Sequence, residues 1–252
     1  MAYKFALEHE HYGDYASGWV FYNLPGHPAF PIRLASEVFQ RCMRMRAARG
    51  LDGPVRLYDP CCGGAYHLAV LAYLHWEEIG AITASDIDAQ AVAIAQRNLA
   101  LLTPSGLQRR ITEIEEMQRL YGKASHDEAR QSAQVLQERL LQLTSTHPIA
   151  PVVFQADALQ GEEMRARLAG RVVDLVISDI PYGIQSHWEL STAAGRKPPV
   201  WLLLENLRGI LAEEALVTIA SAKQERIAHE AYRQVGKLKV GKRQVVFLMK
   251  NV

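Results

Sequence analysis

The sequence of 252 residues has little of what secreted disulfide proteins, membrane proteins and strongly basic nucleic-acid binders depend on. Its three cysteines, two of them adjacent, provide neither a disulfide framework nor a paired Cys-x-x-Cys zinc pattern, so we expect no metal site. No apolar run is long enough to cross a membrane, and none follows a basic start as in a signal peptide. The net charge is only +1, so any basic surface must be local.

What the chain does have is a strand, a loop of small residues and a helix within residues 55–74. Val55, Leu57 and Tyr58 predict a short buried strand, and an apolar run from about residue 66 predicts a helix. The seven residues between them, Asp59 to Ala65, are mostly small. This order is typical of the first unit of a Rossmann-like sheet, in which a ligand lies so close to the loop that side chains would collide with it.

The spacing within this loop indicates which ligand. A dinucleotide fingerprint needs small residues at its first, third and sixth positions, and Tyr66 at the sixth is a poor fit. The pattern acid-x-small-x-small-x-small, with Asp59, Cys61, Gly63 and Ala65, instead resembles the first motif of class I S-adenosylmethionine (SAM)-dependent methyltransferases. The resemblance implies that these residues bind SAM. A turn between strand and helix that binds no ligand is the alternative.

Acidic residues follow the next two predicted strands. Residues 81–85 end at Asp86, where a ribose is held by paired hydrogen bonds, and Asp88 is placed to cap the following helix. Residues 152–154 lead to Asp157, where the methyltransferase pattern implies an acid that reaches the adenine amino group. A cap or turn is the alternative role for Asp157.

A fourth strand, residues 172–178, ends in Asp179-Ile180-Pro181-Tyr182-Gly183. Asp/Asn-x-Pro-aromatic resembles the motif of methyltransferases that modify planar amino nitrogens. An exocyclic amine is a weak nucleophile, and acceptors that hold its hydrogens aim it at the methyl group. We expect Asp179 to be one acceptor, the bend at Pro181 to present the carbonyl of Ile180 as another, and Tyr182 to stack on the base. Guanine N2 would suit this site.

Two local basic patches suggest contacts with phosphate. One is the predicted helix 32–49, whose arginines outnumber its acids, and the other is the C-terminal segment, which has no acid after residue 230. If both flank the mouth of the site, they form a track for an RNA backbone. The candidate residues are Arg33, Arg41, Arg44, Arg46, Lys242 and Arg243.

The other segments complete a single domain, 1–252, with an N-terminal extension over residues 1–50. Its aromatic residues either pack on the domain or offer stacking surfaces to bases. Residues 103–148 predict an inserted helical hairpin that rests on the sheet edge, with a break at 122–125 and Ser125 as N-cap. We expect a helix over 200–211, a strand over 215–220, a helix over 224–234, and a terminal hairpin from 237–240 and 244–249.

Taken together, PAFPIRLASEVFQR, LYDPCCGGAYHL, ASDIDAQAVAIAQRNLALL and SDIPYG resemble the avilamycin-resistance rRNA methyltransferase family. The resemblance implies an α/β class I methyltransferase fold, with a seven-stranded sheet that is parallel except for one strand. It implies SAM as cofactor, a guanine of 23S rRNA as substrate, and resistance to a ribosome-targeting antibiotic. We expect a cytoplasmic monomer. The alternatives are an N-methyltransferase for another RNA, a protein or a small molecule, and a SAM-binding module without catalysis.

Overall fold

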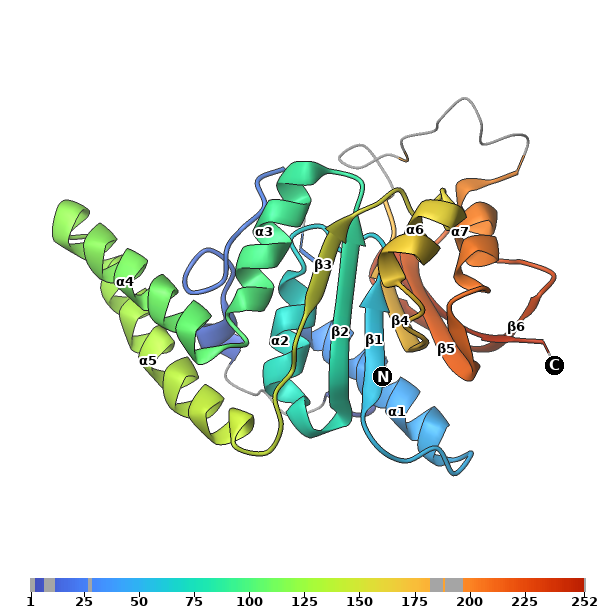
Figure 1. Cartoon of the computed structure of the whole chain (residues 1–252), viewed down its shortest axis with the longest axis horizontal. Coiled ribbons are helices and arrows are strands. Elements are labelled where there is room, and N and C mark those ends of the chain that lie inside the picture. Colours follow the sequence, from blue (N-terminus) through green and yellow to red (C-terminus); the bar gives the residue numbers. More distant parts are fainter. Residues whose placement is uncertain (1–2, 7–11, 27–28, 182–187, 189–196, 252) are drawn as a thin grey trace.

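The computed structural model describes residues 3–6, 12–26, 29–181, 188 and 197–251, and its centre is a seven-stranded sheet (Figure 1). The strand order is β3-β2-β1-β4-β5-β7-β6, and β7 alone runs antiparallel to its neighbours. This confirms the predicted fold class. The strands are β1 Val55–Asp59, β2 Ile79–Asp86, β3 Val152–Gln155, β4 Val173–Asp179, β5 Leu211–Ala222, β6 Tyr232–Val240 and β7 Arg243–Lys250.

Helices cover both faces of the sheet. Leu57 of β1 packs into a core beneath α1 and α2, whereas Tyr58 points into a second core beneath α6 and α7. Because both faces are buried, the central parallel strands are apolar almost throughout. The helices are α1 Ile32–Ala47, α2 Tyr66–Leu74, α3 Ala89–Ala100, α4 Pro104–Tyr121, α5 Ala124–Thr144, α6 Gly161–Leu168 and α7 Pro199–Leu207, with short 3-10 turns η1 Tyr12–Tyr15 and η2 Trp76–Glu78.

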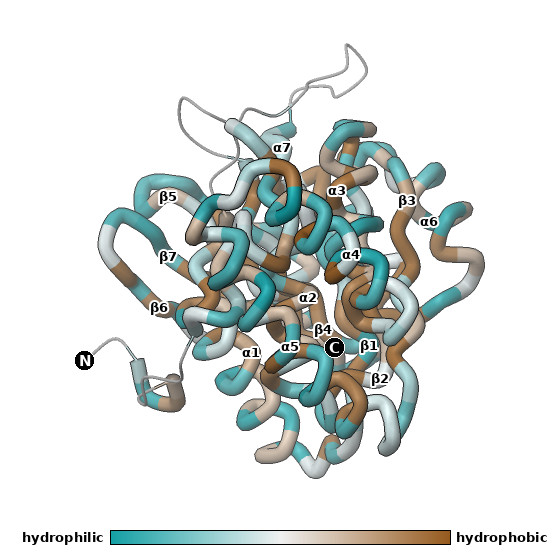
Figure 2. Tube along the Cα trace, turned by 90° about the vertical axis from the view of Figure 1, so that its left-hand side faces the viewer, coloured by the Kyte–Doolittle hydropathy of each residue, from teal (hydrophilic) through white to brown (hydrophobic). Residues whose placement is uncertain are grey.

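The insertion forms the predicted hairpin, α4 and α5, but not in the predicted position. It packs mainly against α2, α3 and η1, so it extends the helical layer rather than resting on the sheet edge. Gly122 ends α4 in a left-handed conformation, and Lys123 rather than Ser125 is the N-cap of α5. Val135, expected on the apolar stripe, is 50% exposed. Figure 2 shows hydrophilic and hydrophobic segments alternating along both helices, as in amphipathic helices.

Two predictions near the C-terminus were wrong in type or extent. Residues 224–234 are not helical: a turn and an irregular segment lead to β6, which begins at Tyr232. Pairing with β7 overrides the local helical tendency, since β6 then satisfies its backbone hydrogen bonds along one edge. The predicted helix 200–211 ends at Leu207, and β5 begins at Leu211. The predicted hairpin is present, and both of its strands are longer than expected.

The N-terminal aromatic residues pack on the domain. Tyr15, Phe21 and Phe30 are at most 4% exposed and belong to the same core as α1 and α2. This supports the packing interpretation for these three rings, which have no face available for a base.

Candidate active site at the carboxyl edge of the sheet

The parallel strands bring the predicted cofactor and catalytic residues to one edge. Asp59, Asp86 and Asp179 are the last residues of β1, β2 and β4, at the top of the sheet in Figure 1, and Asp157 follows β3. A cavity of about 50 Å³ lies among these ends. It is lined by Pro60, Cys61, Asp86, Ile87, Asp157, Ala158, Pro181 and Trp188.

Asp59 shapes the first loop from inside the protein. It is fully buried, its Oδ1 accepts the Cys61 amide at 2.9 Å, and its Oδ2 lies 3.0 Å from Nε2 of His67 on α2. The Cys62 amide bonds to the Ser85 carbonyl at 2.9 Å, which ties the loop to β2. Asp59 does not line the cavity, and the contacts that the structure shows for it hold the loop in place.

Packing and backbone geometry explain why the residues of this loop are small. Gly63 and Ala65 both have positive φ, 52° and 51°. A Cβ on Gly64 would lie 2.9 Å from Cγ2 of Ile94 on α3. We expected these residues to be small because of a ligand, but Gly64 is small because of α3. Ala65, buried in a left-handed conformation that costs about 1–2 kcal/mol, explains why a glycine is usual there.

Asn98 on α3 fixes this loop, and the sequence did not single it out for that role. Its Nδ2 donates to the carbonyls of Gly64 at 2.8 Å and Tyr22 at 3.0 Å, and its Oδ1 accepts the Tyr22 amide at 2.7 Å. The side chain is fully buried and satisfied. One amide thus joins the loop, α3 and the N-terminal segment. A polar residue on the buried face of a predicted helix was the available signal.

Asp86 faces the cavity while it supports the loop. Its Oδ2 accepts the Gly63 amide at 2.8 Å and its Oδ1 accepts the Asp88 amide at 3.1 Å. Burial raises the pKa of Asp86, and the two amides only partly offset this effect. A carboxylate has about four acceptor positions, so Asp86 retains capacity for two hydroxyl groups. Asp88 caps α3 as predicted, accepting the Gln90 amide at 2.8 Å.

Asp157 combines a turn contact with a position at the cavity, so it has features of both the turn role and the ligand-binding role that the sequence left open. Its Oδ1 accepts the Leu159 amide at 2.8 Å, which is a turn contact, and its side chain lines the cavity beside Asp86.

Cys61 joins the first loop to the end of β4. Burial, followed by the charges of Asp59 and Asp86, raises the pKa of its thiol well above the usual value, and Ser178 acts in the opposite direction. These effects favour the neutral thiol over the thiolate, which is the nucleophilic form of cysteine.

Asp179, at the end of β4, lies beside Arg243, the first residue of β7. Its Oδ2 is 3.6 Å from Nη2 of Arg243. The Ile180 amide bonds to the Ala220 carbonyl at 3.1 Å, and Pro181 reaches the cavity wall. Tyr182 lies outside the described residues. Trp188, which the sequence did not assign, forms part of the same wall.

The arginines of α1 do not form the predicted outward face. Arg46 is 7% exposed, and Arg41 pairs at 2.7 Å with the buried Glu37. Arg33 bonds to the Ala6 carbonyl at 2.9 Å and lies over the Tyr3 ring. These guanidinium groups stabilise the N-terminal segment and the core boundary.

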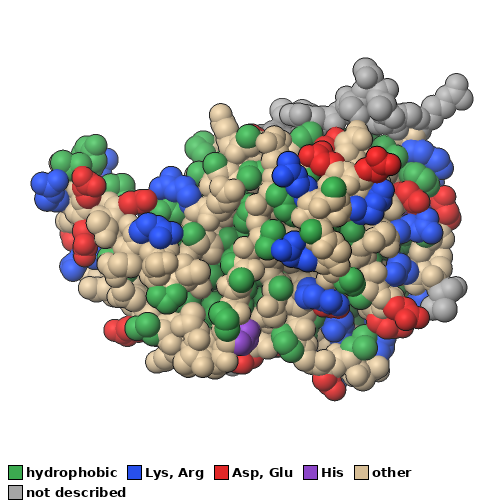
Figure 3. All heavy atoms as spheres, viewed as in Figure 1, with side chains coloured by type: hydrophobic (Ala, Val, Ile, Leu, Met, Phe, Trp, Pro, Cys, Tyr) green, Lys and Arg blue, Asp and Glu red, His purple; other side chains and the backbone are tan. Residues whose placement is uncertain are grey.

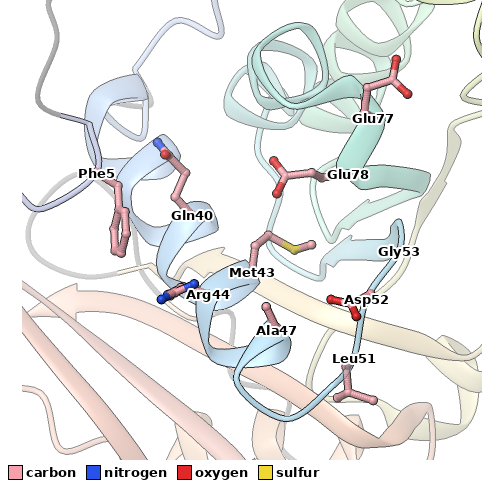
Figure 4. Close-up of a pocket in the computed structure, with 10 residues that line it drawn as sticks. All are labelled: Phe5, Gln40, Met43, Arg44, Ala47, Leu51, Asp52, Gly53, Glu77 and Glu78. Carbon is pink, nitrogen blue, oxygen red and sulfur yellow. The ribbon is translucent and has the colours of Figure 1, made fainter.

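Arg44 is exposed, but at the opposite edge of the sheet. It lines a cavity of about 460 Å³ together with residues 51–53, which precede β1, and Glu77 and Glu78, which precede β2 (Figure 4). The structure therefore does not bring Arg44 together with Asp179.

The terminal hairpin does reach the carboxyl edge. Lys242 is exposed in the turn between β6 and β7, next to Arg243, and its carbonyl accepts the Lys223 amide at 3.2 Å. Figure 3 shows basic and acidic side chains interspersed over the face seen in Figure 1, consistent with the small net charge. Of the two predicted basic patches, only the hairpin lies near the site.

Two absences hold for the described part of the chain. Across these residues, no group of three or more His, Cys, Asp or Glu side chains is arranged to hold a metal ion. Within the same ranges, no helix is long and apolar enough to cross a membrane.

Comparison with known proteins decides the family. The model of the rRNA methyltransferase AviRa family matches residues 1–243. The chain belongs to this AviRa family. A 23S rRNA (guanine(2535)-N(1))-methyltransferase of Streptomyces viridochromogenes is 38% identical over 247 residues, which cover 98% of this chain and 95% of that relative. The target atom of that relative is the ring nitrogen N1 of guanine, not the exocyclic N2 that Asp179-x-Pro181-Tyr182 led us to expect.

Solved structures agree. The rRNA methyltransferase AviRa from S. viridochromogenes superposes with a TM-score of 0.84 at 39% identity, covering 99% of this chain and 96% of that one. A putative class I SAM-dependent methyltransferase from Listeria monocytogenes has a TM-score of 0.50 at 14% identity, covering 91% of this chain and 62% of that one. The second likeness shows the fold alone.

Proposed function

We propose that this AviRa-family protein transfers a methyl group from SAM to a guanine of 23S rRNA, at N1. The observation that carries the proposal is the relation to the 23S rRNA guanine methyltransferase, which extends over 98% of the chain at 38% identity. The carboxyl-edge site supports it, because residues of both predicted motifs line one cavity.

The residues around the cavity suit SAM. Asp86 has acceptor capacity for two ribose hydroxyls, and Asp157, which lines the cavity beside it, is proposed to reach the adenine amino group. The cavity of about 50 Å³ is smaller than the roughly 300 Å³ usual for a ligand site, and Pro181 and Trp188 form part of its wall. When bound, SAM supplies an electrophilic methyl group on a sulfonium sulfur.

The end of β4 presents the groups for the target base. Asp179 is the acceptor for a base hydrogen, Pro181 forms part of the cavity wall, and Tyr182 is proposed to stack on the base. A base reaches these groups only when it is unstacked, in a loop or flipped out of a helix.

The RNA backbone is proposed to follow the terminal hairpin. Lys242 is exposed in the turn and precedes Arg243, which lies beside Asp179. Lys242 can therefore contact a phosphate while the base is in the site. Of the α1 arginines, three are buried or engaged and Arg44 lies at the other edge, so we assign the track to the hairpin.

Methyl transfer from labelled SAM to purified RNA tests the proposal. We expect label in unmodified 23S rRNA and none in 16S rRNA or transfer RNA. Label in another RNA or in protein would indicate one of the alternative methyltransferase substrates. SAM binding without transfer to any acceptor would indicate a binding module. Resistance of cells to avilamycin stays a prediction, tested by expressing the chain in a sensitive strain.

A further inference from the structure

The pair formed by Asp179 and Arg243 is placed to do more than an ordinary surface ion pair. The two side chains are 14% and 23% exposed, and their Oδ2 and Nη2 atoms are 3.6 Å apart. This distance lies within the range of an ion pair and exceeds that of a normal hydrogen bond. A guanidinium has five N–H donors in a planar fork and can therefore remain beside the carboxylate while it donates to a second acceptor.

The sheet register explains how the two charges meet. Asp179 pairs with Ala220 of β5, and Arg243 pairs with Ala222 on the other side of the same strand. The intervening side chains are methyl groups, which leave room for Arg243 to extend over the end of β5 toward Asp179. The result is an acceptor and a donor side by side at the edge where Pro181 lines the cavity.

This order of acceptor and donor matches one edge of guanine. On the Watson–Crick edge, guanine presents the hydrogen of N1 next to the acceptor O6. Adenine presents the reverse, an acceptor at N1 next to a donor amine. We propose that Asp179 and Arg243 bind N1–H and O6 of the target guanine together, and that Arg243 is a catalytic residue. This rests on the proposed function, and it adds the group that selects guanine over adenine and stabilises the charge formed on the base.

The chemistry at N1 requires such a group. Neutral guanine carries a hydrogen on N1, so the nitrogen becomes nucleophilic only when that proton leaves. Asp179 takes the proton, and the electron pair of the N–H bond stays on the base and spreads onto O6. Arg243 donates to O6 and stabilises this negative charge, as an oxyanion hole does. N1 then bonds to the methyl carbon while the bond from that carbon to the sulfonium sulfur breaks, and its electron pair goes to sulfur. The proton passes from Asp179 to solvent, which balances the positive charge lost from sulfur.

Arg243→Ala and Arg243→Lys test the proposal in methyl transfer to a 23S rRNA fragment. Since loss of one donor to a developing oxyanion costs roughly a hundredfold or more in kcat, we expect about that loss for alanine and a partial recovery for lysine. The loss should shrink as pH rises, because solvent base then helps to remove the N1 proton. SAM affinity should stay within about threefold. Arg119→Ala, which removes an exposed cation from α4 and leaves the terminal hairpin intact, is the matched control and should leave kcat unchanged.

The outcomes distinguish a failure of the proposed function from a failure of the role proposed for Arg243. If the parent protein transfers no methyl to the fragment, the proposed function fails. If the parent is active and Arg243→Ala keeps its kcat, or loses the same factor at every pH, the catalytic role of Arg243 is wrong. A fragment with inosine at the target position, which keeps O6 and N1–H but lacks N2, should be methylated. Its rejection would show that N2 is read instead and would overturn the proposed pairing.

Discussion

Asp86 and Asp174 lie at opposite ends of the sheet, and their pKa values shift in opposite directions. Asp86, at the carboxyl end of β2, has a raised pKa because burial outweighs its hydrogen bonds. Asp174, near the amino end of β4, is subject to burial too, but its two-pronged contact with Arg56 at 2.7 and 2.8 Å wins and lowers its pKa. Burial disfavours the charged form of Asp86, whereas the contact with Arg56 favours the charged form of Asp174.

The cavities at the two ends of the sheet also differ, in volume and in the residues around them. The amino-edge cavity is the larger, about 460 Å³ against about 50 Å³, and it contains the exposed Arg44. Yet the residues of the predicted motifs come together at the smaller cavity, at the carboxyl ends of the strands. Incompletely compensated charge beside convergent polar groups marks a functional site better than volume does.

Asp179→Ala should have the largest effect on methyl transfer of all the variants, and it tests whether the carboxyl edge of the sheet is the catalytic one. Removal of the acceptor that positions the base should reduce turnover by about a hundredfold or more. SAM affinity should stay within about threefold, measured by calorimetry. An equal loss of SAM binding would place Asp179 in the cofactor site.

Asp86→Ala should weaken SAM binding by roughly 2–3 kcal/mol, because charge-assisted hydrogen bonds to the ribose are lost. In the parent protein, SAM affinity should fall as pH drops through the raised pKa of Asp86, since the protonated side chain loses acceptor capacity. Asp86→Asn should remove that pH dependence. Unchanged affinity in Asp86→Ala, or tight binding of NAD, would count against the cofactor assignment.

Asp174→Ala is the counterpart at the amino edge and should affect stability alone. Loss of the partly exposed pair and of the bond to the Arg56 amide should lower the free energy of unfolding by about 1–2 kcal/mol. Because the folded pKa of Asp174 is depressed, its contribution is present above the unfolded pKa and is lost as pH falls through the folded value. Denaturant titrations at neutral and acidic pH measure both. A change in SAM affinity would break the proposed division between the edges.

Lys242→Ala and Arg44→Ala compare the exposed cations of the two predicted patches, with the smallest expected effects. Lys242→Ala should weaken rRNA binding and flatten its salt dependence by about 0.7 to 0.9 in slope for one lost phosphate contact. Arg44→Ala should change neither quantity, because it lies at the other edge. Titrations at several salt concentrations decide this, and the reverse result would move the RNA track to α1.

The sequence was sufficient to locate the first four parallel strands along the chain and their acidic ends. Apolar runs bounded by small or acidic residues predict β1, β2, β3 and β4, and parallel pairing then brings Asp86 and Asp179 to one edge without further information. The prediction of a helix over residues 224–234 was wrong because the end of this segment pairs with β7 as a strand. Local propensity does not reveal such a pairing.

The sequence could not assign the orientation of charged side chains. The α1 arginines alternate with apolar residues as on a solvated face, but the extra N-terminal segment covers that face and engages Arg33 and Glu37. The contact between Asp179 and Arg243 joins residues 64 positions apart and depends on the register of β5 and β7. Such contacts are fixed by tertiary packing, so motifs indicated which residues matter but not what they touch.

Mass mapping of 23S rRNA at nucleotide resolution tests whether the protein methylates a guanine and needs Asp179 to do so. Unmodified 23S rRNA is incubated with SAM and either the parent protein or Asp179→Ala, and each guanosine is examined for an added methyl group and its position. We expect one new N1-methylguanosine with the parent protein and little or none with the variant in the same time. No new methyl group in 23S rRNA with the parent protein, or equal methylation by Asp179→Ala, would contradict this expectation.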